Sequence, residues 1–382
     1  MKITRMEVLA ADVNHPYVFV KLYTDEGISG VGEPSVIGKE HALVGALKDI
    51  EHYVIGADPF AIERLWNQIY RTVIWRGGPV LMAALSGVEH ALWDIKARAL
   101  GVPVWELLGG RVRDRVEVYA WIHGGTPEDC AQDALRRLEE GFRTVKFTPF
   151  EFTGWGHSVA EGKRAEAKVR AVRDAVGDAV GIAIDAHGVL NPVNAVEMAK
   201  RIEPYGILFY EEPVHPENAD AMAEVRRAVR IPIATGERLF GRYVYKDLLV
   251  RGAVDIIQAD VGNCGGILEV YKIAAMAEAF YASLAPHQPW SPLSTAISLH
   301  LDAVVPNFLI QEIPTAGAPP LRHRLLQQQI EQPRDGHLEI PTGPGWGVDL
   351  DEEFVRAHPW DPDKPRSAPW LPLRPDGGLA HT

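Results

Sequence analysis

Residues 207–213, ILFYEEP, form an apolar run that ends in two adjacent glutamates and a proline. Two similar runs flank it along the chain, GIAIDAH at 181–187 and IPIATGE at 231–237. Short, continuous apolar runs of this kind are typical of strands buried on both faces of a parallel sheet. The acidic residues at the ends of the three runs recur every 26 residues, which predicts a repeated strand–helix unit.

The same pattern extends outward from these runs and predicts eight strands. The further runs are VEVYAWI (116–122), RTVKFT (143–148), DIIQAD (255–260), ASLAPH (282–287) and FLIQEI (308–313). Helical stretches such as EDCAQDALRRLEEG (128–141) and NAVEMAKRIEPYG (194–206) lie between them. Eight apolar strands that alternate with helices predict an α/β fold, a (β/α)8 TIM barrel, over residues 116–335.

The two ends of the chain have other patterns. Residues 1–115 predict an α+β domain, in which YVFVKLY, the turn TDEG and ISGVGEP form a hairpin at 17–34. A long amphipathic helix follows over 83–100 and should end at Gly101. Residues 336–382 carry many prolines toward their end and predict an extended strap that packs back on the N-terminal domain.

Composition restricts the kind of partner. The 382-residue chain has a net charge of −12, which argues against nucleic acid and against an anionic membrane surface. The two cysteines, Cys130 and Cys264, lie far apart without metal-ligand spacing. We see no signal peptide and no apolar run of the roughly 20 residues that a membrane span needs, so we expect a cytoplasmic protein.

Asp185, Glu211 and Glu237 end three consecutive predicted strands. The carboxyl ends of barrel strands meet at one mouth, so these carboxylates should converge and repel one another unless a cation lies between them. Ligands that are all oxygen favour a hard cation, and Mg²⁺ fits best. Successive strand residues face opposite sides, so we choose Glu211 as the ligand and expect Glu212 to face the helix layer or a second shell of contacts.

Two histidines should flank this cation. His287 and Asp260 end neighbouring predicted strands, so the carboxylate can orient the imidazole and raise its basicity. His187 follows Asp185 by two residues, and strand alternation would put both on one face. A cation that holds a substrate carboxylate, with one histidine as base and the other as acid, predicts proton abstraction α to the carboxylate followed by β-elimination.

Several motifs together resemble the enolase superfamily. They include TDEGISGVGEP, FYEEPV, TGERLF, CGGILEVYKIAAMAEA, LAPH and GPGWGVDLDEE, and they span nearly the whole chain. Within that superfamily the chain resembles the mandelate racemase-like acid-sugar dehydratases, and most of all the D-galactonate dehydratase family. The resemblance implies a modified (β/α)8 barrel beneath an α+β capping domain, which the C-terminal strap completes, and it implies a homo-oligomer.

The resemblance also implies a role for each site residue. Asp185, Glu211 and Glu237 would bind Mg²⁺. His287, paired with Asp260, would remove the C2 proton of a galactonate-like aldonate, and His187 would protonate the departing 3-hydroxyl to leave a 2-keto-3-deoxy acid. Glu312 would hydrogen-bond the substrate carboxylate as its charge grows, and Lys146 matches the first lysine of a K-x-K pattern.

One position departs from that pattern. Thr148 stands where racemases of the group carry a second lysine and galactonate dehydratases carry asparagine, so a racemase that needs the second lysine is disfavoured. The predicted substrate contacts are Thr148, His15, Trp75, Arg76 and Trp290. Two alternatives stay open: epimerisation, racemisation or cycloisomerisation through the same enediolate, and a barrel that binds a ligand without catalysis.

Overall fold

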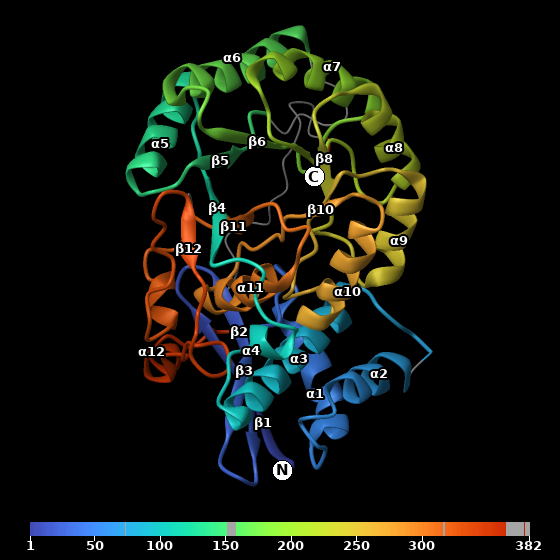
Figure 1. The fold of residues 1–382 in the computed structure, drawn as a ribbon, viewed down its shortest axis with the longest axis vertical. Coiled ribbons are helices and arrows are strands. Elements are labelled where there is room, and N and C mark those ends of the chain that lie inside the picture. The colour runs from blue at the N-terminus through green and yellow to red at the C-terminus, as the bar shows by residue number, and fades with distance from the viewer. Residues whose placement is uncertain (73, 151–157, 316–317, 364–377, 379–382) are drawn as a thin grey trace.

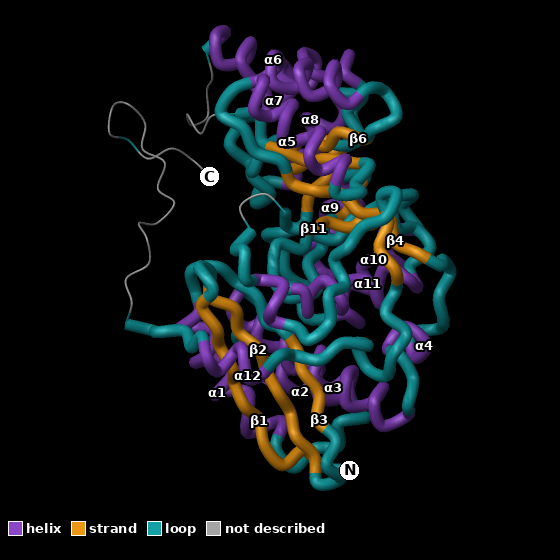
Figure 2. The backbone as a smooth tube through the Cα atoms, turned by 90° about the vertical axis from the view of Figure 1, so that its left-hand side faces the viewer, coloured by secondary structure: helices purple, strands orange, loops and turns teal. Residues whose placement is uncertain are grey.

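The structure is a computed structural model and describes residues 1–72, 74–150, 158–315, 318–363 and 378. It has two parts, which both views separate clearly: a smaller part built mainly from the N-terminal residues, and a barrel built from the middle of the chain (Figures 1 and 2). The helices α5 to α10 form an outer arc around the barrel strands (Figure 1).

Over residues 1–107, with residue 73 not described, the smaller part contains one antiparallel sheet and four helices. Its strands, in the spatial order β1-β2-β3, are β1 (Ile3–Asp12), β2 (Pro16–Thr24) and β3 (Ser29–Gly32). Its helices are α1 (Glu40–Val54), α2 (Ile62–Thr72), α3 (Pro79–Leu100) and α4 (Val104–Leu107). The predicted hairpin is confirmed as β2 paired with β3, and α3 ends at Gly101, whose φ of 71° is the left-handed conformation that glycine adopts without strain.

Eight parallel strands form the barrel, one for each run predicted from the sequence. They are β4 (Arg115–Trp121), β5 (Thr144–Phe147), β6 (Gly181–Asp185), β7 (Tyr210–Glu211), β8 (Ile233–Thr235), β9 (Ile256–Ile257), β10 (Ser283–Leu284) and β11 (Gln311–Ile313). They pair in chain order from β4 to β10, and β11 pairs with β4. A parallel bridge from Leu284 to Phe308, just before β11, closes the ring, so the predicted fold class is confirmed.

Among the described residues, seven helices connect these strands, and the barrel is modified after the last strand. The connecting helices are α5 (Pro127–Glu139), α6 (Val159–Val176), α7 (Pro192–Ile202), α8 (Ala219–Ala228), α9 (Arg242–Arg251), α10 (Ile267–Glu278) and α11 (Pro292–Val304), with a short η1 (Glu203–Tyr205) after α7. Within the described residues after β11, the chain makes the short helix η2 (Arg322–Leu325) and then β12 (His337–Glu339). Strand β12 pairs antiparallel with β4, so the segment predicted as a strap from residue 336 first adds a strand to the barrel sheet.

The chain then returns to the N-terminal sheet. Helix α12 (Glu352–Ala357) packs on β1, and the backbone N–H of Asp12 donates to the carbonyl of His358 at 2.9 Å. The N–H of Trp360 donates to the carbonyl of Ala10 at 3.1 Å. From residue 364 the proline-rich end lies outside the described residues, apart from residue 378.

Two buried glutamates of the N-terminal part hold the first turns of two barrel helices. Glu89, on α3, accepts hydrogen bonds at 3.0 Å from the backbone N–H groups of both Ile267 and Leu268, which begin α10. Glu33 accepts in the same way from Ser291 and Ser294 at the start of α11. A carboxylate at a helix N-terminus satisfies N–H groups that have no partner in the helix, so these contacts fix both barrel helices to the smaller part.

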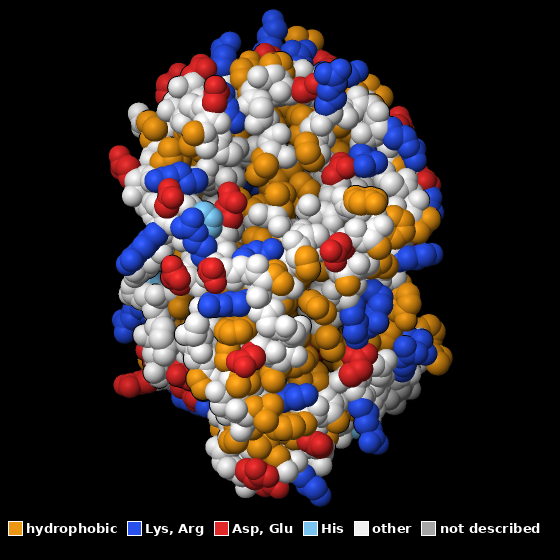
Figure 3. Space-filling view, viewed as in Figure 1, with side chains coloured by type: hydrophobic (Ala, Val, Ile, Leu, Met, Phe, Trp, Pro, Cys, Tyr) orange, Lys and Arg blue, Asp and Glu red, His pale blue; other side chains and the backbone are white. Residues whose placement is uncertain are grey.

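Charged side chains of both signs are interspersed on the face shown in Figure 3. No helix in the described parts of the chain has the length and apolar character that crossing a membrane requires.

Glu89 should make stability depend on pH. Burial raises the pKa of its carboxyl from 4.5 to about 8, although N–H donors from Leu268, Trp93 and Ile267 oppose the shift. The pKa of Glu89 is higher in the folded state than in the unfolded state, so the protonated carboxyl stabilises the fold. This contribution to the free energy of unfolding is complete below about pH 4.5 and is lost as the pH rises toward 8. Between about pH 5 and pH 8, we expect the free energy of unfolding of the wild type to fall by a few kcal/mol relative to that of Glu89→Gln. Melting temperatures of the two proteins across this pH range measure the difference.

The control for this measurement is Glu339→Gln, which replaces an exposed carboxylate on β12. This variant should keep the wild-type dependence on pH. An equal dependence on pH in the wild type and in Glu89→Gln would contradict the interpretation.

Candidate active site

Three carboxylates converge at the carboxyl ends of the central barrel strands. Asp185 and Glu211 are the last residues of β6 and β7, and Glu237 lies two residues beyond β8. One oxygen from each lies within 4.8 Å of the others, and all three side chains have little exposed surface. The convergence predicted from the 26-residue spacing is therefore present.

Lys146 supplies the nearest positive charge to this acidic cluster. Its ammonium lies 2.6 Å from Glu211 Oε2, 3.6 Å from Asp185 Oδ2 and 3.4 Å from Glu312 Oε1, and its side chain is fully buried. Burial disfavours the ammonium, but the carboxylates of Glu211 and Glu312 outweigh that effect and raise the pKa of Lys146 well above its usual value. Lys146 is therefore a permanent cation on the inner side of the cluster.

His287 and Asp260 form the predicted pair. Each lies three residues beyond its strand, β10 or β9, and Nδ1 of His287 is 2.8 Å from Asp260 Oδ2. The other ring nitrogen, Nε2, is 3.2 Å from Glu237 Oε2. Burial lowers the pKa of the imidazole, but Glu237, Glu312 and Asp260 together raise it to about 10.

His187 lies on the other side of the acidic cluster, with Nε2 3.4 Å from Asp185 Oδ2. The predicted reason for this position, strand alternation, is wrong because β6 ends at Asp185. His187 has a φ of 46°, and this left-handed turn brings the imidazole toward the cluster. Its Nδ1 lies 3.1 Å from the hydroxyl of Thr148, so Thr148, predicted as a substrate contact, also orients His187.

Glu212 is bound away from the acidic cluster. The guanidinium of Arg238 donates to both of its carboxylate oxygens, and Glu212 is fully buried. Glu212 has a φ of 37°, so the strand geometry ends between the two adjacent glutamates. The prediction that the two point to different partners agrees with this arrangement, but sequence reasoning did not identify Arg238.

Glu312, in β11, is held by donors on both oxygens. The indole N–H of Trp121 donates to Oε1, and the backbone N–H of Gln288 donates to Oε2 at 2.9 Å. Although burial alone would raise it, Lys146 and His287 lower the pKa of this carboxyl to about 2. Trp121 also stacks on the His187 ring, with centroids 5.8 Å apart. Sequence reasoning missed Trp121, although it is the residue with a polar group at the end of β4.

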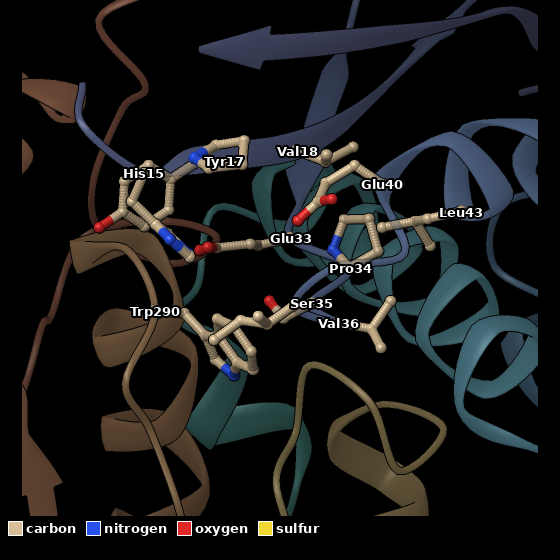
Figure 4. A pocket seen from close by; sticks show the side chains of 12 residues that line it. His15, Tyr17, Val18, Glu33, Pro34, Ser35, Val36, Glu40, Leu43 and Trp290 are labelled. Atoms are coloured by element: carbon tan, nitrogen blue, oxygen red, sulfur yellow. The ribbon is translucent and has the colours of Figure 1, made fainter. Parts of the chain in front are cut away.

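Of the predicted substrate contacts, His15 and Trp290 lie together near His287, whereas Trp75 and Arg76 lie on an exposed loop. Trp290 follows His287 closely, is 6% exposed and faces the ring of His15, with centroids 6.5 Å apart. His15, Glu33 and Trp290 line one small cavity between the two parts of the molecule (Figure 4). Trp75 and Arg76 lie on an exposed loop between α2 and α3, with Trp75 81% exposed, so their contact with a substrate stays a prediction.

The acidic cluster fits a divalent cation. Asp185 Oδ2 and Glu211 Oε1 are buried and accept no hydrogen bond. Buried carboxylate oxygens normally have hydrogen-bond partners, so oxygens without one mark a place for a positive ligand. The donor set is three carboxylates, which suits a hard cation such as Mg²⁺.

Comparison with known proteins gives consistent results over the whole chain. Residues 6–109 match the N-terminal domain of the mandelate racemase / muconate lactonizing enzyme family, and residues 129–354 match the enolase C-terminal domain-like family. The chain is 38% identical to the D-galactonate dehydratase of Pectobacterium atrosepticum and 40% identical to that of Variovorax paradoxus, over 100% of each chain.

Solved structures agree with these relatives. A putative galactarate dehydratase from Agrobacterium radiobacter, with bound Na and L-malate, has a TM-score of 0.92 at 34% identity over 100% of both chains. A putative dehydratase from Salmonella enterica serovar Typhimurium has a TM-score of 0.90 at 33% identity and covers 94% of this chain and 99% of its own.

Removing a single cluster carboxylate should weaken cation binding. We expect Glu211→Gln to reduce the affinity for Mg²⁺ or Mn²⁺ about tenfold or more, because affinity depends on the number of charged ligands. Isothermal titration of the metal-free protein measures this directly. Glu139→Gln, which alters an exposed carboxylate on α5, should bind as the wild type does, and equal affinity in the two variants would contradict the assignment.

Proposed function

Because the chain belongs to the enolase superfamily, in the mandelate racemase / muconate lactonizing enzyme family, we propose that it is a hydro-lyase acting on a sugar acid. The reaction is the dehydration of a galactonate-like aldonate to a 2-keto-3-deoxy acid. The observation that carries this proposal is the placement of two imidazoles on opposite sides of one acidic cluster. Nε2 of His287 lies beside Glu237, and Nε2 of His187 lies beside Asp185.

His287 is the base. Its Nδ1 faces Asp260, which leaves Nε2 toward the acidic cluster, where the substrate carboxylate would be held. Removal of the C2 proton by Nε2 leaves an enediolate, whose charge increases at the carboxylate oxygens. Lys146 lies within 4 Å of two cluster carboxylates, those of Asp185 and Glu211, and of Glu312, so its positive charge also offsets part of the increased charge.

His187 is the acid. It donates a proton to the 3-hydroxyl group, the C3–O bond breaks and water leaves. The enol that remains takes up a proton at C3 and becomes the 2-keto-3-deoxy acid, so the net change is the loss of one water molecule. Thr148 contacts Nδ1 of His187, and Nε2, 3.4 Å from Asp185 Oδ2, is the nitrogen on the side of the acidic cluster that makes this transfer.

Asp185, Glu211 and Glu237 would hold Mg²⁺. When bound, Mg²⁺ supplies positive charge that stabilises the negative charge of the substrate carboxylate. L-malate, present in the structure from Agrobacterium radiobacter, carries a hydroxyl group next to a carboxylate, as an aldonate does. This likeness supports a 2-hydroxy acid as the substrate class. The proposal also includes a cytoplasmic location and a homo-oligomeric state. Sedimentation analysis of the purified protein tests the oligomeric state.

A panel assay tests the reaction itself. The purified protein is incubated with Mg²⁺ and a set of aldonic and aldaric acids, D-galactonate and D-gluconate included, and semicarbazide detects 2-keto-3-deoxy products. We expect one strong substrate and loss of its turnover when EDTA removes the metal. If no acid gave a 2-keto-3-deoxy product but one of them exchanged its C2 hydrogen in D₂O, the proposed reaction would be epimerisation and not dehydration.

The division of labour between the histidines gives a separate prediction. His187→Asn should lower the rate of dehydration by about 100-fold or more, which is within the usual contribution of a general acid, because the leaving hydroxyl loses its proton donor. The same variant should still exchange the C2 hydrogen with D₂O, because His287 and Asp260 are intact. NMR of the recovered substrate measures the exchange.

His287→Asn is the matched comparison and should lose both dehydration and exchange. Loss of exchange in His187→Asn as well would overturn the assignment of His187 as the acid.

A further inference from the structure

Trp290 donates its indole N–H to the carboxylate that orients the catalytic base. Nε1 of Trp290 lies 2.6 Å from Asp260 Oδ2, the same oxygen that lies 2.8 Å from Nδ1 of His287. The other oxygen, Oδ1, accepts the backbone N–H of Gly262 at 2.6 Å. Asp260 is fully buried, so these three donors are the contacts that determine its orientation within the described site.

Two of these three groups, the indole N–H of Trp290 and the backbone N–H of Gly262, can act only as hydrogen-bond donors. An indole N–H and a backbone N–H donate and never accept. Each therefore holds one of the two oxygens of Asp260 in place. A carboxylate held in this orientation accepts the proton of Nδ1, which places that proton between His287 and Asp260. In the neutral imidazole the lone pair then lies on Nε2, the nitrogen that faces the acidic cluster.

The rest of Trp290 is fixed by the protein. Its backbone N–H donates to Gln288 Oε1 at 2.6 Å, and its carbonyl accepts from the guanidinium of Arg322. The Trp290 ring lies at 90° to the His287 ring, with centroids 6.2 Å apart, and stacks with the His15 ring at a centroid distance of 6.5 Å. The cavity that Trp290 shares with His15 and Glu33 has a volume of about 10 Å³ (Figure 4). A space of that size holds about one water molecule.

We propose that Trp290 is a positioning residue, whose indole N–H keeps Asp260 oriented so that His287 presents the Nε2 lone pair to the C2 hydrogen. This inference rests on the proposed function, because it assigns to Trp290 an effect on proton abstraction. It differs from the role in substrate contact that the sequence predicts for Trp290. The two roles predict different kinetic changes, since a positioning residue affects kcat and a substrate contact affects KM.

Trp290→Phe tests the proposal, because it keeps an aromatic ring and removes the N–H. We expect kcat to fall about tenfold with KM within about twofold, and the primary isotope effect for substrate deuterated at C2 to increase, because abstraction becomes slower relative to later steps. The control is Trp105→Phe, which also removes an indole hydrogen bond, from Nε1 to the carbonyl of Pro341 at 2.9 Å. This control should leave kcat and the isotope effect unchanged.

Two kinetic outcomes would overturn the proposal. In the first, KM rises while kcat is unchanged, which makes Trp290 a substrate contact. In the second, neither kcat nor the isotope effect changes. If Trp290→Phe does not fold, site-specific incorporation of benzothienylalanine at position 290 keeps the shape of indole without its N–H, and the same expectations apply.

Crystal structures separate this proposal from the proposed function. If the wild type dehydrates no acid sugar, the proposed function fails, but the structures of the wild type and Trp290→Phe still test the positioning. We expect the Asp260 carboxylate to rotate away from Nδ1 of His287 in the variant. An unchanged Asp260 would overturn the inference whatever the substrate.

Discussion

The burial of several carboxylates around a single ammonium group is the constraint on which the rest of the site depends. Asp185, Glu211 and Glu312 all lie within 4 Å of Lys146, which is fully buried, and Glu237 adds a further negative charge beside Glu211 and Asp185. One ammonium cannot neutralise this group in a medium of low dielectric constant. Burial, together with the charges of Asp185 and Glu237, therefore raises the pKa of Glu211 well above its usual value, and a divalent cation would offset this repulsion. Burying these carboxylates close together lowers the stability of the metal-free fold, and binding of the cation would recover that free energy.

The N-terminal part contributes no residue that we assign to proton transfer, yet it fixes the segments that do. Glu89 holds the start of α10, which follows the segment of Asp260, and Glu33 holds the start of α11, which follows His287 and Trp290. The φ of Gly266 is 95°, and a Cβ there would lie 2.2 Å from a carboxylate oxygen of Glu89, so glycine permits the close approach. The segments that carry Asp260 and His287 are thus held by contacts with the N-terminal part as well as by the barrel. Single residues in the N-terminal part can affect the geometry of His287 without contacting a substrate.

Sequence patterns predicted the parts of the site that follow from regular structure. The spacing of Asp185, Glu211 and Glu237 reflects the strand–helix repeat, and each lies at or just beyond a strand end, as expected for a barrel. The partners of Glu212 and Glu312 were not predictable, because Arg238 and Trp121 reach them only through tertiary packing. The turn at His187 was not predictable either, since a positive φ in a residue other than glycine has no reliable sequence signal. The prediction that His187 lies near Asp185 agrees with the structure, but the argument from strand alternation that led to it was wrong.

The two histidines differ in the groups that hold them, and in the proposed reaction this difference favours elimination over racemisation. Asp260 bonds Nδ1 of His287 as a carboxylate, which favours an imidazole that accepts a proton at Nε2. Thr148 bonds Nδ1 of His187 through a neutral hydroxyl, which both donates and accepts and so allows His187 to hold or release a proton. A lysine at position 148 would place a second cation and a second base on that side of the mouth. Threonine there leaves His187 as the nearer group able to transfer a proton, so in the proposed reaction an enediolate formed by His287 would meet an acid rather than a second base.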